Sequence, residues 1–216
     1  LNLFTGSKNN AEENVTLTFI PPQGRTVSIE GNRGHLSHFF QALRQQVRTN
    51  KIRVAHYGDS GNEGDLVTSD IRVKLQREFG GSGVGFLAIT AQDIRFRQTM
   101  KHTFSNNWKT ESVLTGNRSN YALGLNGFAS VPQGNSWVKY EATSTTPSAN
   151  MARVLYTNAK ASSVRYSVNG GAEQTVALQP GKDLKEIVVN HTGTITSFEL
   201  KTTMADQAQF IGVSFE

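Results

Sequence analysis

The chain is 216 residues long, with 37% hydrophobic and 18% charged residues, a composition typical of a folded protein and not of a disordered one. Its net charge of +5 comes from 22 lysines and arginines against 17 aspartates and glutamates, but the basic residues are scattered, which argues against a nucleic-acid-binding tract. The absence of cysteine excludes disulfides and thiolate metal sites, and no segment approaches the roughly 20 apolar residues that a membrane-spanning helix needs.

The first third of the chain has helical periodicity on both sides of a short β-branched run. Two alternating segments within residues 14–31 predict a peripheral hairpin. Apolar residues at spacings of three and four predict a helix over residues 36–47, with Ser37 as a possible N-cap. The run IRVAHY (52–57) predicts a short strand, and a second helix follows to about Phe79. Helix, strand, turn and helix in this order are typical of an α/β protein.

The rest of the chain has the short alternating runs of a β protein. The glycines of GGSGVG (80–85) end the helical pattern. The clearest hairpin is SVRYSVNGGAEQTVAL, whose two strands meet at Asn169-Gly170-Gly171. About ten such strands predict an antiparallel β-sandwich. The expected strands cover residues 85–89, 94–100, 120–131, 136–142, 152–158, 163–170, 174–178, 185–190, 195–203 and 208–216.

The tripeptide Gly58-Asp59-Ser60 lies on the expected turn between the short strand and the second helix. A serine in this position is exposed beside the free amide groups of a helix start, which makes Ser60 a candidate nucleophile. Gly58 permits a tight bend, and the Asp59 side chain can order the loop by hydrogen bonding. The backbone N–H groups of Ser60 and Gly61 are candidate donors to an oxyanion. The alternative is a structural Asp-Ser helix cap, which is common.

Other candidate residues have simpler structural interpretations. Glu63 and Asp65 lie at the helix start, where the helix dipole favours negative charge, so helix capping is the default interpretation. Trp108, in the polar stretch FSNNWKT, is the best candidate for an exposed aromatic residue that stacks on a sugar ring. The histidines have no metal-ligand spacing, and nothing in the sequence brings His191 to Ser60. No metal and no cofactor are expected.

The stretch AHYGDSGNEGDLVTSDIRVKLQREFGGSGVGF resembles the first conserved block of the SGNH hydrolases, also called GDSL esterases. It is most similar to a branch whose block reads His-Tyr-Gly-Asp-Ser and whose members carry an inserted β-sandwich like a carbohydrate-binding module. The close match covers about residues 36–87, and the sandwich matches in pattern only. The resemblance implies that Ser60 is the nucleophile and an oxyanion donor through its amide, while Asp59 orders the loop.

The resemblance also implies residues that this sequence lacks. An SGNH hydrolase needs a glycine donor, an asparagine from a Gly-x-Asn-Asp-like block and a base from an Asp-x-x-His motif. No aspartate here is followed by histidine at the third position, and neither GNRSN nor LGLNG has the Asn-Asp pair. Two explanations stay open: the chain is the N-terminal part of a longer enzyme, or it is a pseudoenzyme. The first is favoured, because one strand and two helices cannot form a doubly wound sheet.

The sequence therefore predicts an α/β segment followed by an all-β domain. Residues 1–88 are expected to be the incomplete N-terminal part of an SGNH-type, flavodoxin-like sheet, and residues 89–216 an antiparallel, jelly-roll-like sandwich. The expected function is that of a serine esterase or O-acyltransferase acting on acyl groups, with acetyl favoured, of a periplasmic or extracellular polysaccharide. The remaining SGNH segment is expected on another chain or beyond Glu216. The alternative is a non-catalytic glycan-binding protein with a relic Gly-Asp-Ser turn.

Overall fold

The computed structural model describes residues 31–45, 51–58, 60–91, 94–114, 122–202 and 208–216. The hairpin expected within residues 14–31 falls outside this part of the chain. The chain forms two compact units, residues 1–45 and residues 46–216. None of the helices in the described part has the length and apolar character that crossing a membrane requires.

The first unit contains a 3-10 helix, η1 (Arg33–Leu36), that continues directly as α1 (Ser37–Arg44). The side-chain oxygen of Asn32 caps η1 by accepting a hydrogen bond from the Gly34 N–H at 3.0 Å. The expectation that Ser37 is the N-cap of α1 is wrong. Leu36 holds that position, and the Ser37 hydroxyl instead donates to the Gly34 carbonyl at 2.6 Å. The helix is also shorter than the expected range of 36–47.

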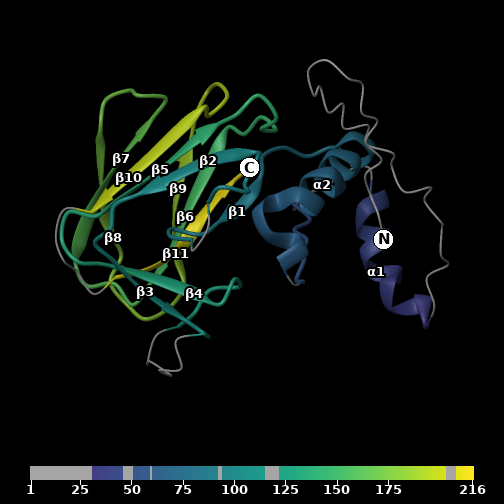
Figure 1. Ribbon diagram of the computed structural model, residues 1–216, viewed down its shortest axis with the longest axis horizontal. Helices are drawn as coiled ribbons and strands as arrows, with labels where there is room; N and C mark the ends of the chain where they lie inside the picture. The colour runs from purple at the N-terminus through teal and green to yellow at the C-terminus, as the bar shows by residue number, and fades with distance from the viewer. Residues whose placement is uncertain (1–30, 46–50, 59, 92–93, 115–121, 203–207) are drawn as a thin grey trace, which may run out of the picture. The chain divides into compact units, whose positions relative to one another are not determined.

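The second unit is dominated by an antiparallel β-sandwich of two sheets (Figure 1). One sheet has the strand order β3-β4-β11-β6-β9, with β1 also paired to β11, and the other has the order β2-β5-β10-β7-β8. The strands are β1 (Gly85–Leu87), β2 (Met100–Phe104), β3 (Trp108–Ser112), β4 (Phe128–Pro132), β5 (Trp137–Ala142), β6 (Met151–Thr157), β7 (Ser162–Val168), β8 (Gln174–Leu178), β9 (Lys185–Asn190), β10 (Ser197–Thr202) and β11 (Gln209–Phe215).

The core of this unit lies between the two sheets. In β10 buried residues alternate with half-buried ones, as expected for a strand with one face turned inward, whereas every residue of β11 is buried. The ring of Phe215 in β11 contacts the rings of Tyr140 and Phe198 in the opposite sheet, at 5.3 and 5.9 Å between centroids. Burial of a large apolar side chain stabilises a fold by roughly 1.5–3 kcal/mol, so these rings join the sheets strongly.

Most of the expected strands are confirmed, including β5 to β11, but three segments differ. Residues 94–99 form a turn-containing loop, and the strand begins only at Met100. Of the described part of the segment 120–131, which begins at residue 122, only the end lies in a strand, β4. Strand β3 was not expected, because its sequence WKTES is polar; pairing with β4 and an ion pair between Lys109 and Glu111 at 2.9 Å accommodate the polar residues.

The hairpin between β7 and β8 is confirmed. Its strands pair from Ser162 with Leu178 to Tyr166 with Gln174. Asn169 and Gly170 both have positive φ, 53° and 68°. This left-handed geometry suits asparagine and glycine and matches the twist of the hairpin. β1 precedes the expected domain boundary at residue 88 and pairs with β11; the boundary itself stays a prediction.

His102 of β2 is buried among the aromatic side chains of the sandwich. Its ring stacks on Tyr140 at 4.8 Å, and its Nε2 donates to the carbonyl of Ile89 at 2.9 Å. Burial lowers the pKa of His102 to about 4; the hydrogen bond to Ile89 opposes this and the charge of Arg97 adds to it. The imidazole is therefore neutral at pH 7.

We expect the free energy of unfolding to fall as the pH is lowered from about 6.5 to about 4, because in this window the unfolded imidazole binds a proton and the folded one does not. The loss from His102 should be at most about 3.5 kcal/mol, at roughly 1.4 kcal/mol per pKa unit. Urea unfolding at several pH values measures it. The variant His102→Gln keeps a hydrogen-bond donor but does not titrate, so its pH slope should be smaller; an unchanged slope would contradict the assignment.

Candidate functional site

Residues 51–58, which lead into the Gly-Asp-Ser turn, have no regular secondary structure. The expectation of a strand over residues 52–57 is therefore wrong. A strand is stabilised by hydrogen bonds to a neighbour, and no strand of the described residues pairs with this segment. Val54 and Tyr57 are 57% and 68% exposed. The segment is instead tied to the sandwich by side chains near its two ends.

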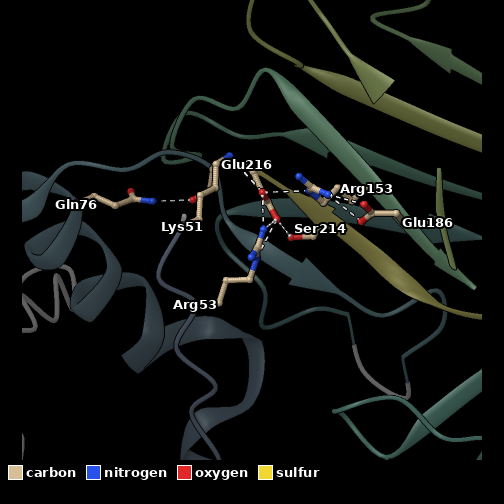
Figure 2. Close-up of polar contacts among 8 residues, drawn as sticks. Lys51, Arg53, Gln76, Arg153, Glu186, Ser214 and Glu216 are labelled. Atoms are coloured by element: carbon tan, nitrogen blue, oxygen red, sulfur yellow. Dashed lines mark hydrogen bonds and ion pairs between the residues drawn. The ribbon is translucent and has the colours of Figure 1, made fainter. Parts of the chain in front are cut away.

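At the first end, three cationic side chains converge on the carboxylate of Glu216, directly after β11 (Figure 2). Arg53 donates from Nη2 to both carboxylate oxygens at 2.9 Å, Lys51 Nζ lies 3.2 Å from Oε2, and Arg153 Nε lies 3.3 Å from Oε2. The Glu216 side chain is only 6% exposed. Burial raises the pKa of Glu216, but the hydrogen bonds and charges of Arg53 and Lys51 outweigh it and lower the pKa to about 2.

Further contacts hold α2 (Leu66–Phe79) beside the same strand end (Figure 2). The side-chain amide of Gln76 donates to the carbonyl of Gly83 at 2.9 Å. Gly83 has a φ of 72°, and a Cβ at this position would lie 2.1 Å from the Phe215 carbonyl oxygen. Only glycine fits there. The end of β11 therefore positions both the segment before the turn and the helix after it.

At the other end of the segment, the Tyr57 hydroxyl donates to the Leu125 carbonyl at 3.0 Å. The 3-10 helix η2 (Ser60–Asp65) then begins at Ser60 and continues as α2, which confirms the expected second helix. Asp59 lies outside the described residues. The roles of Ser60 as nucleophile, Asp59 in ordering the loop and Gly61 as amide donor therefore stay predictions.

The junction of η2 and α2 is fastened to the loop of residues 94–99. Asp65 is the N-cap of α2 with a φ of 69°, but its side chain makes no capping hydrogen bond, so the expectation that its carboxylate caps the helix is corrected. The carboxylate instead accepts hydrogen bonds from the Gln98 N–H at 3.2 Å and from the Thr99 hydroxyl. Arg97 forms an ion pair with it at 3.9 Å. The side chain of Glu63 lies outside the described parts.

Two glycines allow the chain to approach its neighbours closely around the turn. Gly64 has a φ of 70°, and a Cβ there would lie 2.5 Å from the backbone of Phe96. A Cβ on Gly58 would lie 2.1 Å from the side-chain nitrogen of Asn62. Both are shorter than any real contact, so a side chain at Gly64 would push the helix start away from the loop.

Arg72 of α2 and Arg97 both neighbour the Asp65 carboxylate. Burial lowers the pKa of each guanidinium, and the charge of Asp65 opposes this. Arginine remains protonated in proteins at neutral pH, so two positive charges share one negative charge. The three side chains of Asp65, Arg72 and Arg97 together therefore carry one net positive charge.

Two of the described histidines form side-chain hydrogen bonds within the sandwich, whereas His35 of the first unit lies 3.4 Å from the side chain of Asn32. His102 bonds to Ile89, and His191 lies 3.2 Å from the side chain of Asn169. Among the described residues, no group of three or more His, Cys, Asp or Glu side chains is arranged to hold a metal ion.

Trp108 does not offer an exposed platform, and this expectation is wrong. Its side chain is 9% exposed, its indole N–H donates to the Trp137 carbonyl at 2.9 Å, and its ring packs edge-on against Phe210 at 5.9 Å. Polar neighbours in the sequence indicated exposure, but alternate residues of a strand point to opposite faces. Trp108 points into the core.

The fold and these contacts define an antiparallel β-sandwich protein in which a helical segment carrying a Gly-Asp-Ser turn is tied to one end of the sandwich. No protein-family model matches the chain, and no curated protein matches its sequence. Among solved structures it is similar to a peptidoglycan O-acetylesterase, with 20% identity and a TM-score of 0.51 over 74% of this chain and 41% of that chain. At this identity the likeness shows the fold alone.

Two solved carbohydrate-binding modules are more distantly similar. A mutant of the family 29 module CBM29-2 has 10% identity and a TM-score of 0.37 over 61% of this chain and 91% of that chain. A CBM35 module from Paenibacillus barcinonensis has 13% identity and a TM-score of 0.36 over 53% and 91%.

The likeness to the esterase extends beyond the sandwich. The strands run from Gly85 to Phe215, about three fifths of the chain, so a match over 74% includes residues before β1. The chain spans about two fifths of the length of that esterase.

We expect Asp65→Asn to destabilise the protein by about 1–3 kcal/mol, because it removes the charge from a buried, hydrogen-bonded carboxylate and leaves Arg97 unpaired. Asparagine tolerates the positive φ at this position, so backbone strain does not contribute. Asp70→Asn, on the exposed side of α2, is the matched control. Urea unfolding measures both; equal effects would mean that the Asp65 contacts do not hold the helix.

Glu216→Gln should destabilise the protein by about 1–3 kcal/mol at pH 7, because one neutral amide cannot replace a carboxylate that three cations share. Since the folded pKa of Glu216 is depressed to about 2, its contribution is complete above pH 4.5 and is lost as the pH falls towards 2. The difference between native protein and variant should shrink across that window. The charged contacts of Glu216 would not stabilise the fold if the difference in free energy of unfolding between native protein and variant did not vary with pH. The same conclusion would follow if the exposed control Glu78→Gln had an equal effect.

Proposed function

We propose that the chain is part of a serine esterase or O-acyltransferase that acts on acyl groups, most simply acetyl groups, of an extracytoplasmic polysaccharide. The observation that carries this proposal is that Ser60 is the first residue of the helical run from η2 to α2, directly after a segment tied to the sandwich. The likeness of fold to a peptidoglycan O-acetylesterase, extending to residues before β1, supports it.

In the proposed reaction the Ser60 oxygen attacks the ester carbonyl carbon while a base takes the hydroxyl proton. The backbone N–H groups of Ser60 and Gly61 donate to the oxyanion, and Asp59 holds the loop in shape. The carbon–oxygen bond to the sugar then breaks, and the sugar oxygen receives the proton. Water resolves the acyl-enzyme in hydrolysis, whereas a second sugar hydroxyl resolves it in transfer.

The base belongs to the remaining SGNH segment, which we place on another chain or beyond Glu216. Two observations support a further layer beside the turn. No strand of the described residues pairs with residues 51–58, and α2 keeps Leu66, Val67 and Ile71 between 40% and 45% exposed. In an α/β sheet such a helix would cover neighbouring strands. A polysaccharide substrate places the protein in the periplasm or outside the cell.

Ser60→Ala tests the proposal in the complete polypeptide with p-nitrophenyl acetate as substrate. We expect hydrolysis to fall by about 10³-fold or more, because no other group replaces the attacking oxygen. Ser69→Ala is the control; its hydroxyl donates to the Leu66 carbonyl on α2, and activity should not change. Undiminished activity of Ser60→Ala would refute the assignment of Ser60 as the nucleophile.

The 216 residues alone should show little or no turnover, because the base is missing from them. Robust Ser60-dependent hydrolysis by this chain would mean that it contains its own base. A complete polypeptide that binds glycans but hydrolyses no ester would favour the non-catalytic alternative.

A further inference from the structure

A depression lined by both polar and apolar side chains lies at one edge of the sandwich, far in the sequence from the Gly-Asp-Ser tripeptide. It is formed by residues of β7, β8 and the turn between them from one sheet, and by residues of β9 and its following loop from the other. β8 and β9 are the edge strands of their sheets. The depression has a volume of about 220 Å³. Its walls include Tyr166, Ala172, Gln174, Val189, Asn190 and His191.

Asn169, in the β7–β8 turn, fixes His191 at the rim of the depression. Its side-chain oxygen accepts from the backbone N–H groups of Thr196 and Ser197 at 2.7 and 3.0 Å. Since backbone N–H groups only donate, the orientation of the amide is determined, and its nitrogen donates to the Thr194 carbonyl and to His191 Nε2. In this arrangement the imidazole accepts at Nε2 and carries its proton on Nδ1.

On the opposite wall, a hydrogen bond between Tyr166 and Gln174 holds both side chains in place. The Tyr166 hydroxyl donates to the side-chain oxygen of Gln174 at 2.7 Å, across a register pair of β7 and β8. The Tyr166 ring is half-buried and stacks on Phe198 at 6.0 Å. This hydrogen bond uses the oxygen of Gln174 and leaves the amide N–H groups as donors for a ligand.

The chemistry of these walls suits a neutral polyhydroxylated ring. They carry neither a carboxylate nor a lysine or arginine, so nothing in them compensates a charged ligand. Carboxamide, imidazole and phenol groups donate and accept hydrogen bonds, as sugar hydroxyls require. The partly exposed ring of Tyr166 and the half-buried side chain of Val168 offer apolar surface. The volume is below the range of pockets that hold drug-sized ligands, which limits the ligand to about one ring.

We propose that this depression binds one neutral pyranose unit of a polysaccharide chain. The Tyr166 ring would contact the apolar face of the sugar, while Gln174, Asn190 and His191 bond its hydroxyls. The inference rests on the proposed function only for the choice of a polysaccharide as ligand. Its residues are distinct from Ser60, so the sandwich would hold the polymer while the ester chemistry takes place at the turn.

Calorimetric titration of the full chain tests the site with three trisaccharides: the N-acetylglucosamine trimer, cellotriose and trigalacturonate. We expect at least one neutral trimer to bind and trigalacturonate to bind more weakly. Ala172→Phe, which fills the depression from an exposed position, should weaken the binding at least about tenfold, the equivalent of 1.4 kcal/mol. The matched control is Ala177→Phe on the exposed surface of β8, which should change nothing.

Gln174→Ala should weaken binding about five- to tenfold, from the loss of one hydrogen bond, while the exposed control Gln179→Ala should have no effect. Binding of neither neutral trimer, tighter binding of trigalacturonate, or equal effects of Ala172→Phe and Ala177→Phe would overturn the proposal. Ser60→Ala separates the two proposals. Sugar binding without Ser60-dependent hydrolysis by the complete polypeptide refutes only the esterase, and hydrolysis by the complete polypeptide without sugar binding refutes only this site.

Discussion

The side chain of Glu216 is almost completely buried and yet charged, which a protein tolerates only when cations and hydrogen bonds compensate the lost hydration. Arg53, Lys51 and Arg153 supply that compensation. Through Arg53 and Lys51 the end of β11, in which every residue is buried, is joined to the segment that precedes Ser60. That segment pairs with no described strand, so its position depends on this charge cluster more than on any backbone ladder.

A second buried carboxylate holds the start of α2 in the same way. The buried carboxylate of Asp65 takes hydrogen bonds from the loop before β2 and an ion pair from Arg97, so the start of α2 is also held by a carboxylate. Ion pairs and hydrogen bonds of this kind position a segment but do not cover its apolar side chains. Val54 and Ile71 consequently stay exposed beside the turn. In the proposed function, these side chains would be covered by further elements of an α/β sheet.

The sandwich combines two different uses of the same residue type. His102, enclosed by Tyr140 and Phe104, is a neutral core residue whose one hydrogen bond goes to a backbone carbonyl. His191 lies in the wall of the edge depression, where Asn169 sets its tautomer. His102 is buried and serves to pack the core. His191 is partly exposed and held in one orientation, which suits the proposed ligand binding. The proposed sugar site would therefore lie on the same sandwich to which the segment before Ser60 is attached.

Local patterns were sufficient for the strands from β5 to β11, for the Asn169-Gly170 turn and for α2, because alternation, helical spacing and positive-φ preferences act over a few neighbouring residues. The turn at Ser60 was placed by its motif, and its chemistry stays a prediction. Only the tertiary structure decided that no strand of the described residues pairs with residues 52–57 and that Trp108 points into the core. It also decided that the carboxylates of Glu216 and Asp65 hold neighbouring segments by ion pairs and hydrogen bonds. Strand pairing, burial and charge compensation depend on residues far apart in the sequence, such as Arg53 and Glu216, which no local pattern connects.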